Sequence, residues 1–107
     1  MVTIDDFKKL EMRIGTVVSA EKVADSDKLV KLVFDLGKEK RQIMAGIAEF
    51  VTDLSSLIGK QMPILINLEP RTFRGHESRG MIIATDVDGR PVFLHPAEEV
   101  PAGSIVK

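Results

Sequence analysis

Apolar and polar residues alternate along much of this chain, and a period of two is the pattern of a half-buried β-strand. The first alternating run covers residues 11–23, with Ile14 and Val18 on its apolar face and Arg13 on its polar face. Gly15 lies inside this unusually long run. A glycine in such a place predicts a bulge or bend of the kind that curls a strand around a barrel.

More segments have the composition of strands. They are the runs Leu29–Leu36, Glu39–Ala45, Met62–Leu68 and Met81–Asp86 and the short segment Pro91–Leu94. Proline has no N–H to donate, so Pro63 predicts that the fourth run begins at a sheet edge. The pair Asp88-Gly89 predicts a tight turn before the last short strand. The tail from His95 contains two prolines and a glycine, and we expect it to be mostly irregular.

Helical segments are predicted to be few and short. Residues Thr3–Leu10 form one candidate helix, in which Thr3 can cap the N-terminus and Asp5 and Asp6 suit the positive end of the helix dipole. Residues 47–58 carry apolar side chains at helical spacing but have only a weak helical pattern. We therefore expect two short helical pieces in a chain made mainly of strands.

The order of these elements is three strands, a short helical link and two more strands. This is the order of the oligonucleotide/oligosaccharide-binding fold (OB-fold), a five-stranded β-barrel. We expect an all-β protein, with residues 1–107 forming a single domain with short helices and a C-terminal extension. OB-folds bind ligands on strands 2 and 3 and in the loops joining strands 1–2 and 4–5, which here are Ala24–Lys28 and Glu69–Ser78.

The composition narrows the function classes. The 107 residues are 44% hydrophobic and 29% charged and include no cysteine, which excludes disulfides and thiolate chemistry and fits a reducing cytoplasm. No apolar run is long enough to span a membrane, and the acidic start differs from a signal peptide. The net charge of −1 predicts either selective nucleic-acid binding through a local patch or no such binding.

The strongest candidate for such a patch is the segment between the fourth and fifth runs. It carries Arg71, Arg74 and Arg79, whose planar guanidinium groups suit bidentate phosphate binding. Phe73 lies between two of these arginines and could stack on a base or ribose. An exposed, merely solvated hairpin loop is the alternative. Further cations on the predicted ligand face are Lys28, Lys31, Lys40 and Arg41.

Several short motifs occur in a fixed order along the chain. They are Asp6-Phe7-x-Lys9-Leu10-x-Met12-Arg13-Ile14-Gly15, Ala24-Asp25-Ser26-Asp27-Lys28-Leu29, Gly46-Ile47-Ala48, Gly59-Lys60, Asn67-Leu68-x-Pro70-Arg71-x-x-Arg74-Gly75 and Ser78-x-Gly80-Met81. In these motifs the chain resembles, over nearly its whole length, the tRNA-binding domain at the C-terminus of bacterial methionyl-tRNA synthetases. Similar domains occur as free-standing subunits and in synthetase-associated cytokine-like proteins.

The resemblance implies an OB-fold that recognises tRNA by its shape, largely at the outer corner of the L-shaped tRNA molecule. It implies a homodimer formed through the N-terminal helix and the C-terminal extension, and a possible partner in the catalytic part of methionyl-tRNA synthetase. The expected dimer contacts are the apolar ends Phe7, Leu10, Ile105 and Val106. The expected tRNA contacts are Lys28, Lys31, Arg41, Asn67, Arg71, Arg74, Ser78, Arg79 and Met81, with Asn67 and Ser78 bonding to ribose or base edges and Met81 packing on a base or in the core.

Two other functions compete with tRNA binding. A related OB-fold branch resembles secretion chaperones that hold unfolded polypeptides, an activity that needs an exposed apolar groove. A hydrolase is conceivable from Asp25-Ser26-Asp27, although a polar loop of that composition is more often a turn. His76 and His95 lie far apart without metal-ligand spacing, so we expect neither a metal nor another cofactor, and no catalysis.

Overall fold

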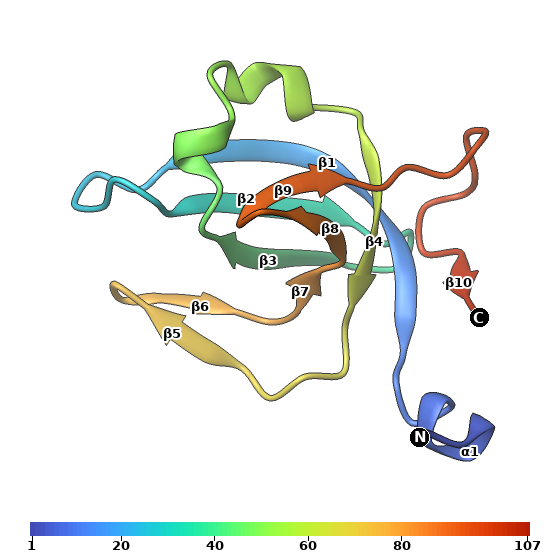
Figure 1. The fold of residues 1–107 in the computed structure, drawn as a ribbon. Coiled ribbons are helices and arrows are strands. Elements are labelled where there is room, and N and C mark those ends of the chain that lie inside the picture. The colour runs from blue at the N-terminus through green and yellow to red at the C-terminus, as the bar shows by residue number, and fades with distance from the viewer.

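The computed structural model describes all 107 residues and contains a barrel of five main strands. These strands are hydrogen-bonded in the order β3-β2-β1-β4-β7 (Figure 1). Strand β10 pairs with the first two residues of β1, Met12 and Arg13. The predicted all-β OB-fold is therefore confirmed. The five barrel strands are β1 (Met12–Lys22), β2 (Val30–Asp35), β3 (Lys40–Ala45), β4 (Gln61–Leu65) and β7 (Met81–Ile82), and the added strand is β10 (Ile105–Val106).

Two small hairpins extend from this barrel. One pairs β5 (Arg71–Phe73) with β6 (His76–Ser78), and the other pairs β8 (Ala84–Val87) with β9 (Arg90–Phe93). The predicted fifth strand is thus divided into β7 and β8, which belong to different sheets. The predicted tight turn at Asp88-Gly89 is confirmed, since both residues have positive φ, as a type I′ hairpin turn requires.

The barrel interior is filled by side chains from the first four strands. Those with less than 2% exposure are Phe34, Leu32, Ile43, Met62, Ile64, Val17 and Val30. They form one cluster, which the 3-10 helices η1 (Ala48–Phe50) and η2 (Leu54–Leu57) partly cover. The interior is thus a packed core, so ligands have to bind on the outside of the barrel.

The long first strand contains a bulge, but not at the position expected. Val17 is 1% exposed whereas Val18 is 39% exposed, and the register with β2 shifts between Val17 and Ser19. Adding one residue at this point reverses the alternation, so the prediction that Val18 faces the core was wrong. Gly15 has a different role, because a Cβ at this position would lie 2.9 Å from Cδ1 of Phe34.

Pro63 marks an edge, as predicted. Strand β4 pairs with β1 along its whole length, but β7 pairs only with Ile64 and Leu65. The first part of β4 therefore has no β7 partner on that side, and the missing N–H of Pro63 breaks no ladder bond there.

The terminal segments lie at the same end of the molecule (Figure 1). Helix α1 (Ile4–Phe7) is one turn long, shorter than predicted, and none of its residues is buried. The C-terminal tail, expected to be irregular, ends in β10, whose residue Val106 pairs with Met12. Both termini lie at the end of the molecule away from the β5–β6 turn (Figure 1). No helix in the structure is long and apolar enough to cross a bilayer.

Replacing Gly15 by Ala should destabilise the fold by about 1–3 kcal/mol, because the new methyl group meets the packed ring of Phe34. Gly46→Ala is the matched control, since no atom lies within 4 Å of a Cβ at that position. Urea unfolding of both variants measures the difference. Equal midpoints would contradict close packing at Gly15.

The N-terminal helix should respond to pH through its capping box. Hydrogen bonds from the backbone and side chain of Thr3, and then from Lys9, lower the pKa of Asp6 from its ordinary 3.8. The stabilisation is therefore present above pH 3.8 and is lost as the pH falls through the lowered folded-state pKa. An NMR titration of Asp6 should show its pKa moving back toward 3.8 in Thr3→Ala, and an unchanged titration would argue against the cap.

Candidate nucleic-acid interface

The arginine-rich segment forms a β-hairpin instead of the loop that was expected. Its strands β5 and β6 are joined by Arg74 and Gly75, which have φ values of 51° and 82°. Positive φ at both central positions is the requirement of a type I′ turn, which twists in the same sense as the flanking strands. The hairpin projects from the barrel toward the same side as the loop between β1 and β2 (Figure 1).

Two arginines of the hairpin have no polar partner within the chain. Arg71 and Arg74 are exposed and form no ion pair or side-chain hydrogen bond. The guanidinium carbon of Arg71 lies 4.9 Å from the ring centroid of Phe73, within the range of a cation–π contact. That contact orients the side chain but leaves its N–H donors free, so both arginines can reach a phosphate.

The remaining candidate cations differ in how free they are. Arg79 lies 4.0 Å from Glu77, and both side chains are more than half exposed; such a pair contributes little. Lys28 is exposed and Lys31 is half-buried, and neither forms an ion pair. These three side chains can add positive potential around the hairpin without being fixed in place.

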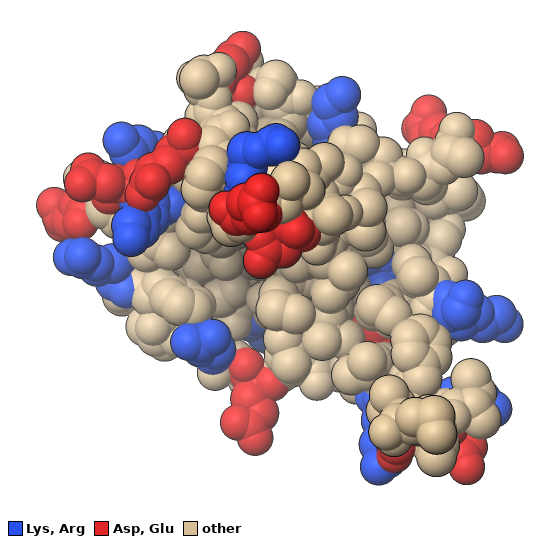
Figure 2. Space-filling model, viewed as in Figure 1, with Lys and Arg blue, Asp and Glu red and all other residues tan.

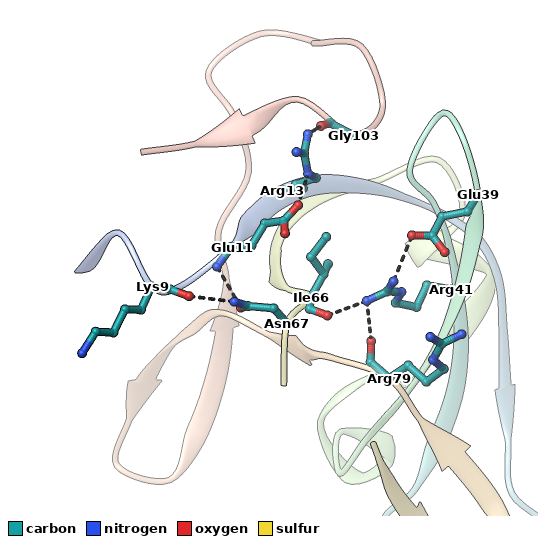
Figure 3. Close-up of polar contacts among 9 residues, drawn as sticks. All are labelled: Lys9, Glu11, Arg13, Glu39, Arg41, Ile66, Asn67, Arg79 and Gly103. Carbon is teal, nitrogen blue, oxygen red and sulfur yellow. Dashed lines mark hydrogen bonds and ion pairs between the residues drawn. The ribbon is translucent and has the colours of Figure 1, made fainter. Parts of the chain in front are cut away.

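Arg41 is engaged inside the protein. Its side chain is only 12% exposed and donates hydrogen bonds to the carbonyl oxygens of Ile66 at 2.5 Å and Arg79 at 3.3 Å (Figure 3). It also forms a 2.9 Å ion pair with Glu39. The expectation that Arg41 contacts tRNA therefore has to be revised, because the residue joins β3 to both ends of the segment that carries the hairpin.

Ser78 also has an internal role. It is 4% exposed, and its hydroxyl accepts a bond from the N–H of Met44 at 3.0 Å and donates one to the carbonyl of Gly80 at 3.2 Å. A ribose cannot reach this hydroxyl, so Ser78 is better described as a structural residue than as a tRNA contact. Met81, by contrast, is 47% exposed at the surface next to it.

The side chain of Asn67 is bonded to the N-terminal segment. Its oxygen accepts from the N–H of Glu11 at 2.8 Å and its amide donates to the carbonyl of Lys9 at 2.7 Å (Figure 3). Asn67 thereby ties the segment after α1 to the start of the arginine-bearing segment. Nothing local in the sequence indicates this partner, which lies more than fifty residues away, so the prediction from sequence did not include it.

Two other positioning residues were not found from the sequence. The side-chain amide of Gln42 donates to the backbone carbonyl of Glu77 at 2.9 Å, and the backbone carbonyl of Gln42 accepts from the N–H of Arg79 at 3.0 Å. Arg13 bonds to Glu11 and to the carbonyl of Gly103 (Figure 3). In the sequence, both have the pattern of ordinary polar positions in half-buried strands.

The other candidate chemistry is accounted for by local structure. The Ser26 hydroxyl accepts from the N–H groups of Lys28 and Leu29, so the segment Asp25-Ser26-Asp27 is a turn. His95 bonds through Nδ1 to the carbonyl of Gln61. No group of three or more acidic, histidine or cysteine side chains gathers in a way that could hold a metal ion.

On the face that Figure 2 shows, the charges form no large area of one sign. In Figure 2 the Lys and Arg side chains are mixed with Asp and Glu over the end of the molecule where the β1–β2 loop lies. This fits the net charge of −1. Binding of a polyanion would thus rest on a few placed cations and not on a broad positive surface.

Comparison with known proteins decides the family. The profile described as "Putative tRNA binding domain" matches residues 12–105, almost the whole chain. The chain belongs to this family. A methionine–tRNA ligase from Archaeoglobus fulgidus is 51% identical over 105 residues, which are 98% of this chain and 16% of that ligase. The tRNA-binding domain therefore corresponds to about one sixth of that relative's length.

Two solved structures are similar over the whole domain. A MetRS (methionyl-tRNA synthetase) related protein from Pyrococcus horikoshii has a TM-score of 0.94 and 38% identity, and the match covers 100% of this chain and 98% of that one. A chaperone, CsaA from Bacillus anthracis, has a TM-score of 0.88 and 29% identity, with 100% and 99% covered. The same fold thus occurs in a synthetase-related protein and in a chaperone.

Ser78→Ala should destabilise the tRNA-binding domain by about 1–3 kcal/mol, because the buried N–H of Met44 loses its acceptor. Ser19→Ala is the control, since Ser19 lies in β1 without a side-chain hydrogen bond. Thermal unfolding measures the difference. A variant that keeps its stability but loses RNA affinity would return Ser78 to the set of ligand contacts.

Proposed function

We propose that this domain binds tRNA in a structure-specific, non-catalytic manner and raises the tRNA affinity of methionyl-tRNA synthetase. The domain would act either within the synthetase chain or as a separate subunit in the cytoplasm. The observation that carries the proposal is the pair Arg71 and Arg74. Both side chains lie on a hairpin of the OB-fold, at a ligand-bearing loop position, and neither forms an ion pair or side-chain hydrogen bond in the chain.

The distribution of cations on the surface supports recognition of tRNA by its folded shape and not by its base sequence. Phosphates and 2′-hydroxyls are the accessible groups of folded RNA, because the A-form major groove is too narrow for side chains. The proposed surface has a small number of separated cations, which are Arg71, Arg74, Arg79, Lys28 and Lys31. It has few aromatic side chains on which bases could stack. Such a surface suits a folded backbone better than a long single strand.

The proposed partner follows from the relatives. The similar ligase from Archaeoglobus fulgidus is about six times as long as this domain, which matches 16% of it. A weakly binding domain adds affinity when it is tethered to a second binding unit, because the second binding event becomes intramolecular. We therefore propose that the domain supplies a supplementary tRNA contact beside a catalytic unit.

We further propose that two copies associate through their terminal segments. Phe7, Leu10 and Ile105 are exposed and Val106 is half-buried at the end of the barrel where α1 and β10 lie. Helix α1 buries none of its own residues. A second copy covering these apolar side chains would provide α1 with a packing partner and double the set of cations.

A chaperone function is the second candidate. The observation that favours it is the 29% identity and TM-score of 0.88 to CsaA. A polypeptide ligand would bind to apolar surface and would depend little on salt. Arg71 and Arg74 have no evident use in that activity, which is why tRNA binding is the first proposal.

The decisive measurement is a titration with folded tRNA, unfolded tRNA and an RNA duplex at two salt concentrations. Each phosphate contact should add roughly 0.7–0.9 to the log–log salt slope. Arg71→Ala combined with Arg74→Ala should weaken tRNA binding and lower that slope by roughly 1.5. The oligomeric state, followed by light scattering, should not change.

The matched control is Lys38→Ala combined with Arg90→Ala, which removes the same charge from exposed positions outside the hairpin. It should lower affinity less and leave the slope nearly unchanged. A flat salt dependence of the unmodified domain, or unchanged binding in the Arg71 and Arg74 double variant, would refute the proposed interface.

A further inference from the structure

A small hollow lies beside the arginine hairpin, between β3, β7 and the foot of β5. It has a volume of about 100 Å³. A buried water needs roughly 10–15 Å³ on the same measure, so the hollow can admit part of a flat ring. The side chains that shape it are Met44, Leu68, Phe73 and Met81 on its walls and Glu69 and Arg71 at its polar positions.

The walls of this hollow are apolar and partly open to solvent. Leu68 is 40% and Met81 is 47% exposed, and Phe73 is half-buried. Single exposed apolar residues are common on proteins, but here two of them and the half-buried Phe73 line one concavity. Methionine and aromatic side chains pack well on flat, polarizable rings.

A stacking surface is already formed at one side. The guanidinium group of Arg71 lies over the ring of Phe73 at 4.9 Å. Guanidinium planes and aromatic rings are the surfaces on which proteins stack bases that have left the helical stack. Arg71 can stack in this way and still donate N–H groups to the phosphate of the same nucleotide.

Recognition of the RNA backbone alone gives Glu69 no role. Glu69 is exposed and lines the hollow with Arg71, yet it forms no ion pair with that arginine or with any other cation. Close to a phosphate it would be repulsive. A carboxylate is favourable at such a surface when it accepts hydrogen bonds from base N–H groups, such as the amino group of cytosine.

We propose that this hollow binds one unstacked nucleobase that carries an exocyclic amino group. The ring lies against Phe73, Leu68 and Met81, the amino group donates to Glu69, and Arg71 holds the adjoining phosphate. Uracil is disfavoured because it presents a carbonyl oxygen to the carboxylate where cytosine presents an amino group. The inference rests on the proposed RNA-binding function and adds to it a preference at a single base.

The test uses the whole chain and two pentaribonucleotides, UUCUU and UUUUU, followed by NMR chemical-shift titration, which detects weak binding. UUCUU should bind roughly tenfold more tightly than UUUUU, as expected for a hydrogen bond to a charged group. Phe73→Ala should weaken UUCUU binding roughly tenfold through loss of stacking.

Glu69→Gln should abolish the preference for UUCUU, because an amide can accept from cytosine and donate to uracil equally. Glu77→Gln is the matched control. Glu77 is exposed on the same hairpin and is not part of the hollow, so its substitution removes the same charge and should leave the affinity ratio unchanged.

Equal affinity for both oligonucleotides, or a preference that persists in Glu69→Gln, would overturn the base site. Folded tRNA is titrated in parallel to separate the two proposals. If tRNA binds with a steep salt dependence but the oligonucleotides do not differ, only the base site fails. If UUCUU is preferred but folded tRNA does not bind, the base site stands and the tRNA proposal fails. If no RNA binds, both fail.

Discussion

The closure of the barrel is the constraint on which the rest of the structure depends. Strands β3 and β7 are in contact but share no continuous ladder of backbone hydrogen bonds. Side chains bridge the gap, with Arg41 bonded to the carbonyls of Ile66 and Arg79, and with Ser78 bonded to the N–H of Met44. Buried donors of this kind stabilise strongly only while their acceptors stay in place. These side-chain bonds between β3 and the segment 66–80 therefore stabilise both the closed barrel and the position of the β5–β6 hairpin.

This arrangement separates residues that build the interface from residues that can use it. Arg41, Ser78 and Asn67 use their polar groups on backbone partners, so they determine where the segment 66–80 runs. Arg71 and Arg74 are not needed to hold this segment, because Arg41, Ser78 and Asn67 already do so. Their N–H donors therefore remain free for a ligand. A ligand surface with few cations needs this rigidity, since poor positioning of any one cation removes a large share of the binding energy.

The sequence predicted the fold better than the site. Alternating apolar residues and the order of strands were enough for the OB-fold, because the side-chain period of two reports directly on burial. The bulge at Val18, the pairing of β10 with β1 and the β5–β6 hairpin were missed, since each depends on interactions made after the chain has folded. The same reason explains Ser78, whose hydroxyl meets Met44 at a sequence separation of 34 residues. Composition and local pattern cannot distinguish such a buried serine from an exposed one.

The pairing of Met12 with Val106 also has a consequence for how the chain folds. It joins residues from almost opposite ends of the sequence, so it has a high contact order and a large loop-closure entropy, both of which slow folding. During synthesis, β10 leaves the ribosome after the other strands of the barrel, and until it arrives the outer edge of Met12 and Arg13 has unpaired backbone groups. An open edge of this kind is a template for pairing with other chains. The two-residue strand β10 thus closes the last open edge of the first strand.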